Sequence, residues 1–123
     1  MRRFLFFTLV LISFNAVAIN DIVSENEKEV VFNPGAYQVD ADFKKAAMHA
    51  LISHDWEILT ATGKIVTGKL RYGDVSPVAI DYRNPKAISI RYTKYNEDSP
   101  LRYLRNLKHF MLDGLLSCAL QKN

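Results

Sequence analysis

The chain of 123 residues contains 16 lysine and arginine residues, 13 aspartate and glutamate residues and a single cysteine. This length fits one domain with a modest core and excludes two independently folded domains. The lone cysteine excludes an intramolecular disulfide, so buried apolar side chains must supply the stability.

The N-terminal residues have the pattern of a secretory signal peptide. Paired arginines precede an apolar run over residues 4–12, and the segment ends in Ala-Val-Ala. The run is shorter than the about 20 apolar residues that a membrane-spanning helix needs. We favour a signal peptide over a buried N-terminal helix because these three features rarely coincide. We therefore expect residues 1–18 to be removed, and the protein to be periplasmic or secreted without a transmembrane anchor.

Charge is unevenly distributed over the 105 residues that remain, whose net charge is only +1. Residues 19–63 have a net charge of −5, and the residues from Lys64 onward have a net charge of +6. Such an asymmetry orients encounters with a charged partner at short range, because physiological salt screens charges over about 8 Å.

The first part of the mature chain, residues 19–36, is predicted to be a polar lead-in with one short strand at residues 30–32. An Asn-Pro-Gly turn ends this segment, since proline fixes φ and glycine tolerates a positive φ. Residues 37–123 are then expected to form the single folded domain.

A helix is predicted from Asp40 to about Ser53, because apolar residues recur there at the spacing of one helical face. Its apolar stripe consists of Phe43, Ala46, Ala47, Ala50 and Leu51.

Four strands with alternating apolar and polar side chains follow this helix. They are predicted over residues 56–60, 64–72, 75–82 and 87–95. The side chains expected to face the core are Trp56, Val66, Leu70, Tyr72, Val78, Ile80, Tyr82, Ile88, Ile90 and Tyr92. Because neighbouring side chains of a strand point to opposite faces, the intervening polar residues must lie on the other face of the sheet.

Ser99 and Pro100 begin a second predicted helix, because serine caps a helix and proline is tolerated at the first helical position. Its core-facing side chains are expected to be Leu104, Leu107, Phe110, Met111, Leu112, Leu115, Leu116 and Cys118. We interpret Cys118 as a small buried hydrophobe rather than a reactive thiol.

The order of these elements predicts an α+β fold in which a short strand, a helix, four antiparallel strands and a second helix follow one another. Both helices are expected to cover one face of an antiparallel sheet of four to five strands, and the other face is left to solvent. This open side carries six candidate binding residues. They are Lys69, Arg71, Arg83, Arg91, Thr93 and Tyr95.

Several segments share a pattern of core residues with a known group of proteins. They are Trp56 after a helix, residues 64–71 with Gly68, the alternating apolar residues at 78–82 and 88–92, and "RYLRNLKHF" at 102–110. In these segments the chain resembles small, mostly uncharacterised exported proteins and lipoproteins of Gram-negative bacteria. The resemblance covers most of residues 40–116 and implies a TATA-binding-protein-like or helix-grip-like domain without catalytic residues. It implies no lipid anchor, because the lipobox cysteine of such lipoproteins has no counterpart here.

No motif in the sequence indicates catalysis, a metal site or a bound cofactor. His49, His54 and His109 match no metal-binding spacing, and neither H-E-x-x-H nor G-x-S-x-G occurs. The glycines lack the spacing of a phosphate-binding loop. We therefore expect a protein that is not an enzyme and that holds no metal or cofactor.

Two functions remain open. The favoured one is a binding or accessory protein of the cell envelope that docks an acidic protein segment or an anionic envelope component on the open side of the sheet. A merely solvated surface is the competing interpretation. A nucleic acid is not expected, because a stacking platform needs several aromatic residues and only Tyr95 is placed there.

The alternative function is a small-ligand carrier with an apolar cavity between the helices and the sheet. The residues expected to line that cavity are Trp56, Tyr72, Tyr82, Tyr92 and Phe110.

Overall fold

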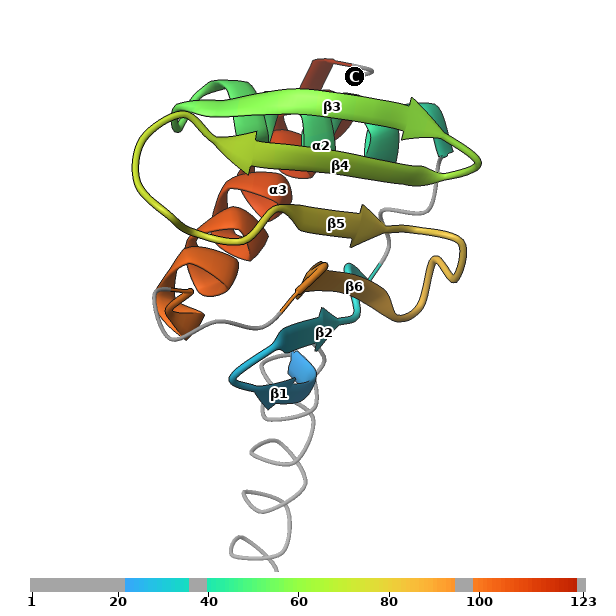
Figure 1. The fold of residues 1–123 in the computed structure, drawn as a ribbon. Helices are drawn as coiled ribbons and strands as arrows, with labels where there is room; N and C mark the ends of the chain where they lie inside the picture. Colours follow the sequence, from blue (N-terminus) through green and yellow to red (C-terminus); the bar gives the residue numbers. More distant parts are fainter. Residues whose placement is uncertain (1–21, 36–39, 95–98, 122–123) are drawn as a thin grey trace, which may run out of the picture.

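The computed structural model describes residues 22–35, 40–94 and 99–121, so the predicted signal peptide lies outside the described residues. The elements are, in chain order, β1 (Ile22–Asn26), β2 (Glu29–Phe32), α2 (Asp40–Ile52), β3 (Trp56–Thr62), β4 (Ile65–Leu70), β5 (Val78–Asp81), β6 (Ile88–Tyr92) and α3 (Leu101–Gln121). Figure 1 shows the strands as one sheet with both helices behind it. Neither of these helices is long and apolar enough to cross a bilayer.

The strands form an antiparallel sheet in the order β1-β2-β6-β5-β4-β3. The predicted α+β class is confirmed, but the sheet has six strands rather than four to five. Strands β3 to β6 form a meander, whereas β2 pairs with β6 and places Val30 opposite Ile90. Helix α2 contacts β3 and β4, and α3 contacts β2 and β6. The two helices therefore divide one face of the sheet between them.

Strands β1 and β2 form a hairpin, of which the sequence pattern predicts only the second strand. Asn26 closes the turn, because its Oδ1 accepts hydrogen bonds from the backbone N of Lys28 (2.8 Å) and Glu29 (3.1 Å). Arg105 of α3 then ties β1 to the domain by donating from Nε to Glu25 Oε1 over 3.0 Å. The polar composition hides β1 because it is an edge strand whose side chains are mostly exposed.

The core lies between the sheet and the helices. Five predicted core residues are confirmed as at most 4% exposed: Trp56, Ile80, Ile90, Leu104 and Leu107. Each large apolar side chain that is removed from water in this way contributes about 1.5 to 3 kcal/mol before the cost of ordering it. The alternation in the strands and the apolar stripes of the helices therefore identify the buried face correctly.

Three predicted core positions are wrong. Tyr72 is 73% exposed, because β4 ends at Leu70 and the alternation does not continue into the bend that follows. Leu116 is 46% exposed, and Cys118 is half-buried rather than buried. Both follow Leu115, the last buried residue of α3, so the helix extends beyond its contact with the core.

Candidate functional site

The face of the sheet opposite the helices carries the side chains that alternate with the core residues. We call this set the open face, and it includes Glu29, Glu57, Thr67, Lys69, Ala79, Asp81, Ser89 and Arg91. Carboxylates of β2, β3 and β5 thus share the surface with the predicted cations. The cross-strand register, rather than the number of cations, decides which charges remain available to a partner.

Asp81 of β5 holds two of the predicted cations. Arg83 donates from Nε to Asp81 Oδ1 over 3.0 Å and from Nη2 to Oδ2 over 2.6 Å, which makes a bidentate pair. Arg91 of β6 donates from Nη1 to the same Oδ2 over 3.2 Å. Its neighbour Ser89 donates to Glu29 Oε2 over 2.6 Å. These bonds join three adjacent strands and neutralise part of the positive charge.

The pKa of Asp81 reflects this arrangement. The side-chain hydrogen bonds from Arg83 lower it to about 2, against the opposing effect of burial, and Arg91 adds a smaller lowering. The side chain of Asp81 is only 10% exposed although no helix covers it. The carboxylate therefore stays ionised at physiological pH, and the cluster of Asp81, Arg83 and Arg91 is a fixed part of the open face.

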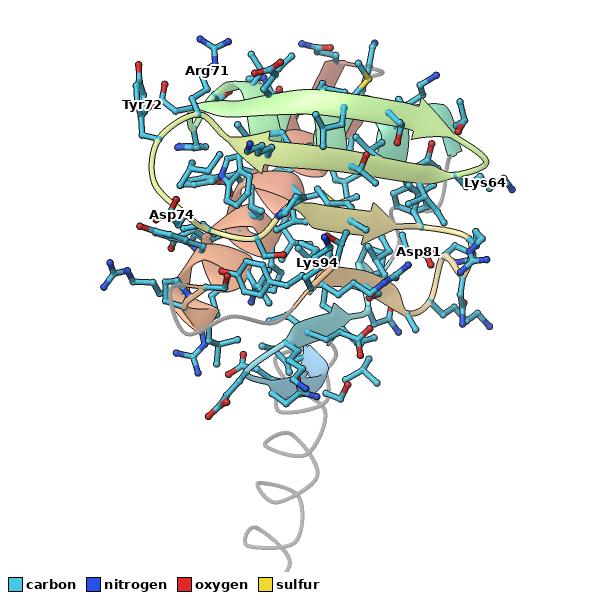
Figure 2. All side chains as sticks on the ribbon, viewed as in Figure 1. Lys64, Arg71, Tyr72, Asp74, Asp81 and Lys94 are labelled. Carbon is cyan, nitrogen blue, oxygen red and sulfur yellow. The ribbon has the colours of Figure 1, made fainter. Side chains whose placement is uncertain are left out.

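Two lysines flank a hollow of about 260 Å³ at one corner of the open face. We call it the corner hollow, and it is lined by Lys69, Gly73, Asp74, Val75, Ser76, Pro77 and Lys94. Both lysines are exposed, and neither makes an ion pair within residues 22–35, 40–94 and 99–121. In Figure 2, Lys94 lies over the sheet and Asp74 lies on the loop that leads to β5.

Hydrogen bonds hold the wall of the corner hollow in place. Thr93 donates both its backbone N (2.8 Å) and its Oγ1 (3.1 Å) to the carbonyl oxygen of Pro77. The backbone N of Lys94 donates to Ser76 Oγ over 3.0 Å, and the backbone N of Ser76 donates to Ser99 Oγ over 3.0 Å. The loop before β5 is thus tied to the end of β6 and to the start of α3, which keeps Lys94 beside the hollow.

The structure separates the predicted site residues. Lys69 lines the corner hollow, while Arg71 follows β4 and projects beside Tyr72 at the edge of the sheet (Figure 2). Thr93 has a structural role in the loop, and Tyr95 lies outside the described residues. Arg83 and Arg91 are paired with Asp81, so they differ from Lys69 in the charge that they leave exposed.

Lys94 is a site residue that the alternation in the sequence does not identify. The predicted strand over residues 87–95 assigns Lys94 to the core side, where a lysine does not fit. That misfit is the available signal, because a charged residue at an inward position indicates that the strand has already ended. In the structure β6 ends at Tyr92, and Lys94 is exposed.

Two further hollows lie along α3. The first, which we call the helix groove, has a volume of about 440 Å³ and is lined by Lys45, Ala46, His49, His54, Phe110, Asp113, Gly114, Ser117, Cys118 and Gln121. The second, the edge hollow, has a volume of about 200 Å³ and is lined by His54, Trp56, Leu70, Tyr103, Asn106, Leu107 and Phe110. Of the residues expected to line a ligand cavity, Trp56 and Phe110 border the edge hollow, and Tyr82 and Tyr92 are buried in the core.

Comparison with known proteins finds no relative of this chain. The resemblance to exported proteins of Gram-negative bacteria stays a prediction, because no family model, curated protein or solved structure matches the chain.

Proposed function

We propose that the protein is a non-catalytic binding protein of the cell envelope, periplasmic or secreted, that docks an acidic protein segment at the corner hollow. The observation that carries this proposal is a contrast between the cations of the open face. Arg83 and Arg91 are paired with Asp81, whereas Lys69 and Lys94 flank a hollow and make no ion pair in the described part of the chain.

Lysines without an ion pair suit the docking of an anion because no carboxylate of the protein has to be displaced. An incoming carboxylate near the corner hollow is attracted to both ammonium groups. At Arg83 or Arg91 it competes with Asp81, whose bonds to the two arginines are 2.6 to 3.2 Å long. Attraction to the corner hollow therefore raises the association rate and makes that rate depend on salt.

The shape and charge of the corner favour a peptide over a lipid surface. A hollow of about 260 Å³ has room for an acidic side chain, whereas a layer of headgroups stays outside it. Asp74 also lines the hollow, and Glu57 lies opposite Lys69 in the register of β3 and β4. These carboxylates repel a uniformly anionic surface but leave room for a segment whose acidic residues are spaced apart.

The test measures the association rate of a fluorescein-labelled peptide of alternating glutamate and glycine at low and high ionic strength. The variant Lys69→Ser/Lys94→Ser should slow association about fivefold at low salt and flatten its salt dependence, because the steering charges are lost. The matched control is Lys44→Ser/Lys86→Ser, which removes the same charge from exposed lysines of α2 and of the turn between β5 and β6. It should keep most of the rate.

Equal losses in the two double variants would show that only net charge matters, and would contradict a docking site. Vesicles that contain phosphatidylglycerol form the second arm. A preference for these vesicles over the peptide would reject the acidic segment and assign the surface to a membrane.

A further inference from the structure

The stacked rings of His54 and Phe110 form the common wall of the helix groove and the edge hollow. The ring centroids lie 3.3 Å apart with an angle of 10° between the planes. His54 is exposed and follows the end of α2, beside Asp55, which has a positive φ of 68°. Because both rings line both hollows, the two hollows adjoin at this wall, and we call the pair the trough along α3.

The end of the trough at the edge hollow is aromatic and apolar. Trp56 and Tyr103 meet edge to face with ring centroids 6.4 Å apart, and Phe110 adds a third ring. Leu70 and Leu107 complete the apolar lining. A lining of this kind takes up the aromatic or aliphatic part of a small molecule.

The end at the helix groove is polar at its rim and closed at its floor. Ala46 and Gly114 bring α2 and α3 together, since a Cβ atom on Gly114 would lie 3.2 Å from Ala46 Cβ. Lys45 and His49 of α2 face Asp113 of α3 across the groove. Within the described ranges Lys45 makes no ion pair, so its charge is available to a ligand.

We propose that this trough binds a small amphiphilic anion, independently of docking at the corner hollow. The apolar part lies against Trp56, Tyr103 and Phe110, and the anionic group lies near Lys45 and His49. The hollows of about 440 and 200 Å³ together have the size of an ordinary small-molecule site. The orientation follows from the lining, because the rings gather at one end and the lysine stands at the other.

Trp56 reports on this site without a label, because it is the one tryptophan of the chain and borders the edge hollow. The probe is bromophenylbutyrate, whose bromine quenches indole fluorescence on contact. Its neutral counterpart is bromophenylbutyramide, which has the same ring and spacer without the charge. We expect saturable quenching by both probes, with the carboxylate binding about fivefold more tightly than the amide.

Two variants test the charged end. Lys45→Ser should abolish the preference for the carboxylate, while its matched control Lys44→Ser removes an exposed charge from the preceding position, outside the helix groove, and should leave the preference unchanged. In the opposite orientation, the carboxylate of the probe would lie near Arg102, whose guanidinium is 5.3 Å from the centroid of the Tyr103 ring. Loss of the preference in Arg102→Ser instead of Lys45→Ser would overturn the proposal.

Two more variants test the trough itself. Phe110→Ala should weaken both probes about tenfold by removing an aromatic wall. Ser117→Phe changes an exposed position of α3 and fills the helix groove without touching the core, so it should block binding of the carboxylate probe. This variant keeps the test valid even if Phe110→Ala does not fold. Quenching that does not saturate in the unsubstituted protein, or that survives Ser117→Phe unchanged, would reject the site.

Discussion

Different interactions stabilise the two faces of the sheet. On the core face, side chains such as Ile80 and Ile90 lie opposite each other and are fully buried beneath the helices. On the open face, Asp81 and its diagonal neighbour Arg91 on the next strand are joined by a salt bridge of 3.2 Å that is partly open to water. An apolar residue type is enough to indicate burial in the core. The role of a charge on the open face depends instead on its neighbours across the strands.

This difference explains why the hydrophobic pattern of the sequence is enough to predict the core face. The available charges of the open face can be identified only from the structure. Substitutions made on one face at a time test this difference, and those on the core face should cause the largest losses of stability.

Ile90→Ala should lower the free energy of unfolding by about 2 to 5 kcal/mol, because it leaves a cavity at a fully buried position of β6. Arg91→Ala, one residue further along, should cost at most about 1.5 kcal/mol, the worth of its hydrogen bonds to Asp81 and Ser89. Urea unfolding of both variants measures the difference. Equal losses of stability would contradict the assignment of these two residues to a buried face and an open face.

Gly68→Ala should destabilise the protein by about 1 to 3 kcal/mol. The added Cβ would lie 3.0 Å from Leu51 Cδ1 and 3.3 Å from the backbone oxygen of Glu57, so the tightly packed Leu51 side chain must shift. The same change in a Leu51→Ala background should cost less, because the nearest atoms have been removed. A double-mutant cycle measured by chemical denaturation gives the coupling, and strict additivity would contradict the close approach of α2 to β4.

The open face should contribute a pH-dependent part of the stability. Since the pKa of Asp81 is about 2 in the folded state, below its ordinary value of 3.8, its contribution is present above about pH 4 and is lost as the pH falls towards 2. We expect a loss of about 1 to 2 kcal/mol, because water screens the exposed partner Arg83. The difference between the unfolding free energies of the unsubstituted protein and Asp81→Asn, measured from pH 6 to pH 2, should shrink over this range. A constant difference would contradict the role of the ion pair.

The smallest expected effect lies at the edge of the sheet. Arg105 lowers the pKa of Glu25 through a side-chain hydrogen bond, yet the Arg105 side chain is 56% exposed. Arg105→Gln should therefore leave global stability almost unchanged, because water screens an exposed ion pair. Hydrogen exchange should be more sensitive, because β1 is held to α3 by this contact and opens locally when it is lost. Unchanged exchange at the amides of β1 would show that pairing with β2 alone keeps the strand in place.

The sequence was sufficient to predict the α+β class and most of the core, because the alternation in residues 78–82 and 88–92 reflects burial directly. It was not sufficient for β1, whose side chains are mostly exposed and whose contact with α3 comes from Arg105, a residue far away in the chain. Tyr72 was misplaced because the pattern does not show where β4 ends. Local periodicity is thus informative inside an element and weak at its boundaries.

The candidate site was less predictable than the fold. The alternation placed Lys69 and Arg91 on the same side of the sheet, but nothing in the sequence indicates that Asp81 pairs with Arg91 and not with Lys69. That choice depends on the register, because Asp81 lies opposite Ser89, two residues from Arg91, on one side and opposite Ile65, four residues from Lys69, on the other. Lys94 joined the site only because β6 ends early and the loop before β5 is tied to its end.

The most direct test of the account is to map where an acidic peptide contacts the protein. Backbone amide chemical shifts of the ¹⁵N-labelled protein are followed by NMR while the peptide of alternating glutamate and glycine is added. The account predicts that the shifts change at Lys69, at Lys94 and over residues 73–76, and stay constant at Asp81 and Ser89. Changes centred on Asp81 and Ser89, with none at the corner hollow, would contradict the distinction between paired and available charges on which the proposed function rests.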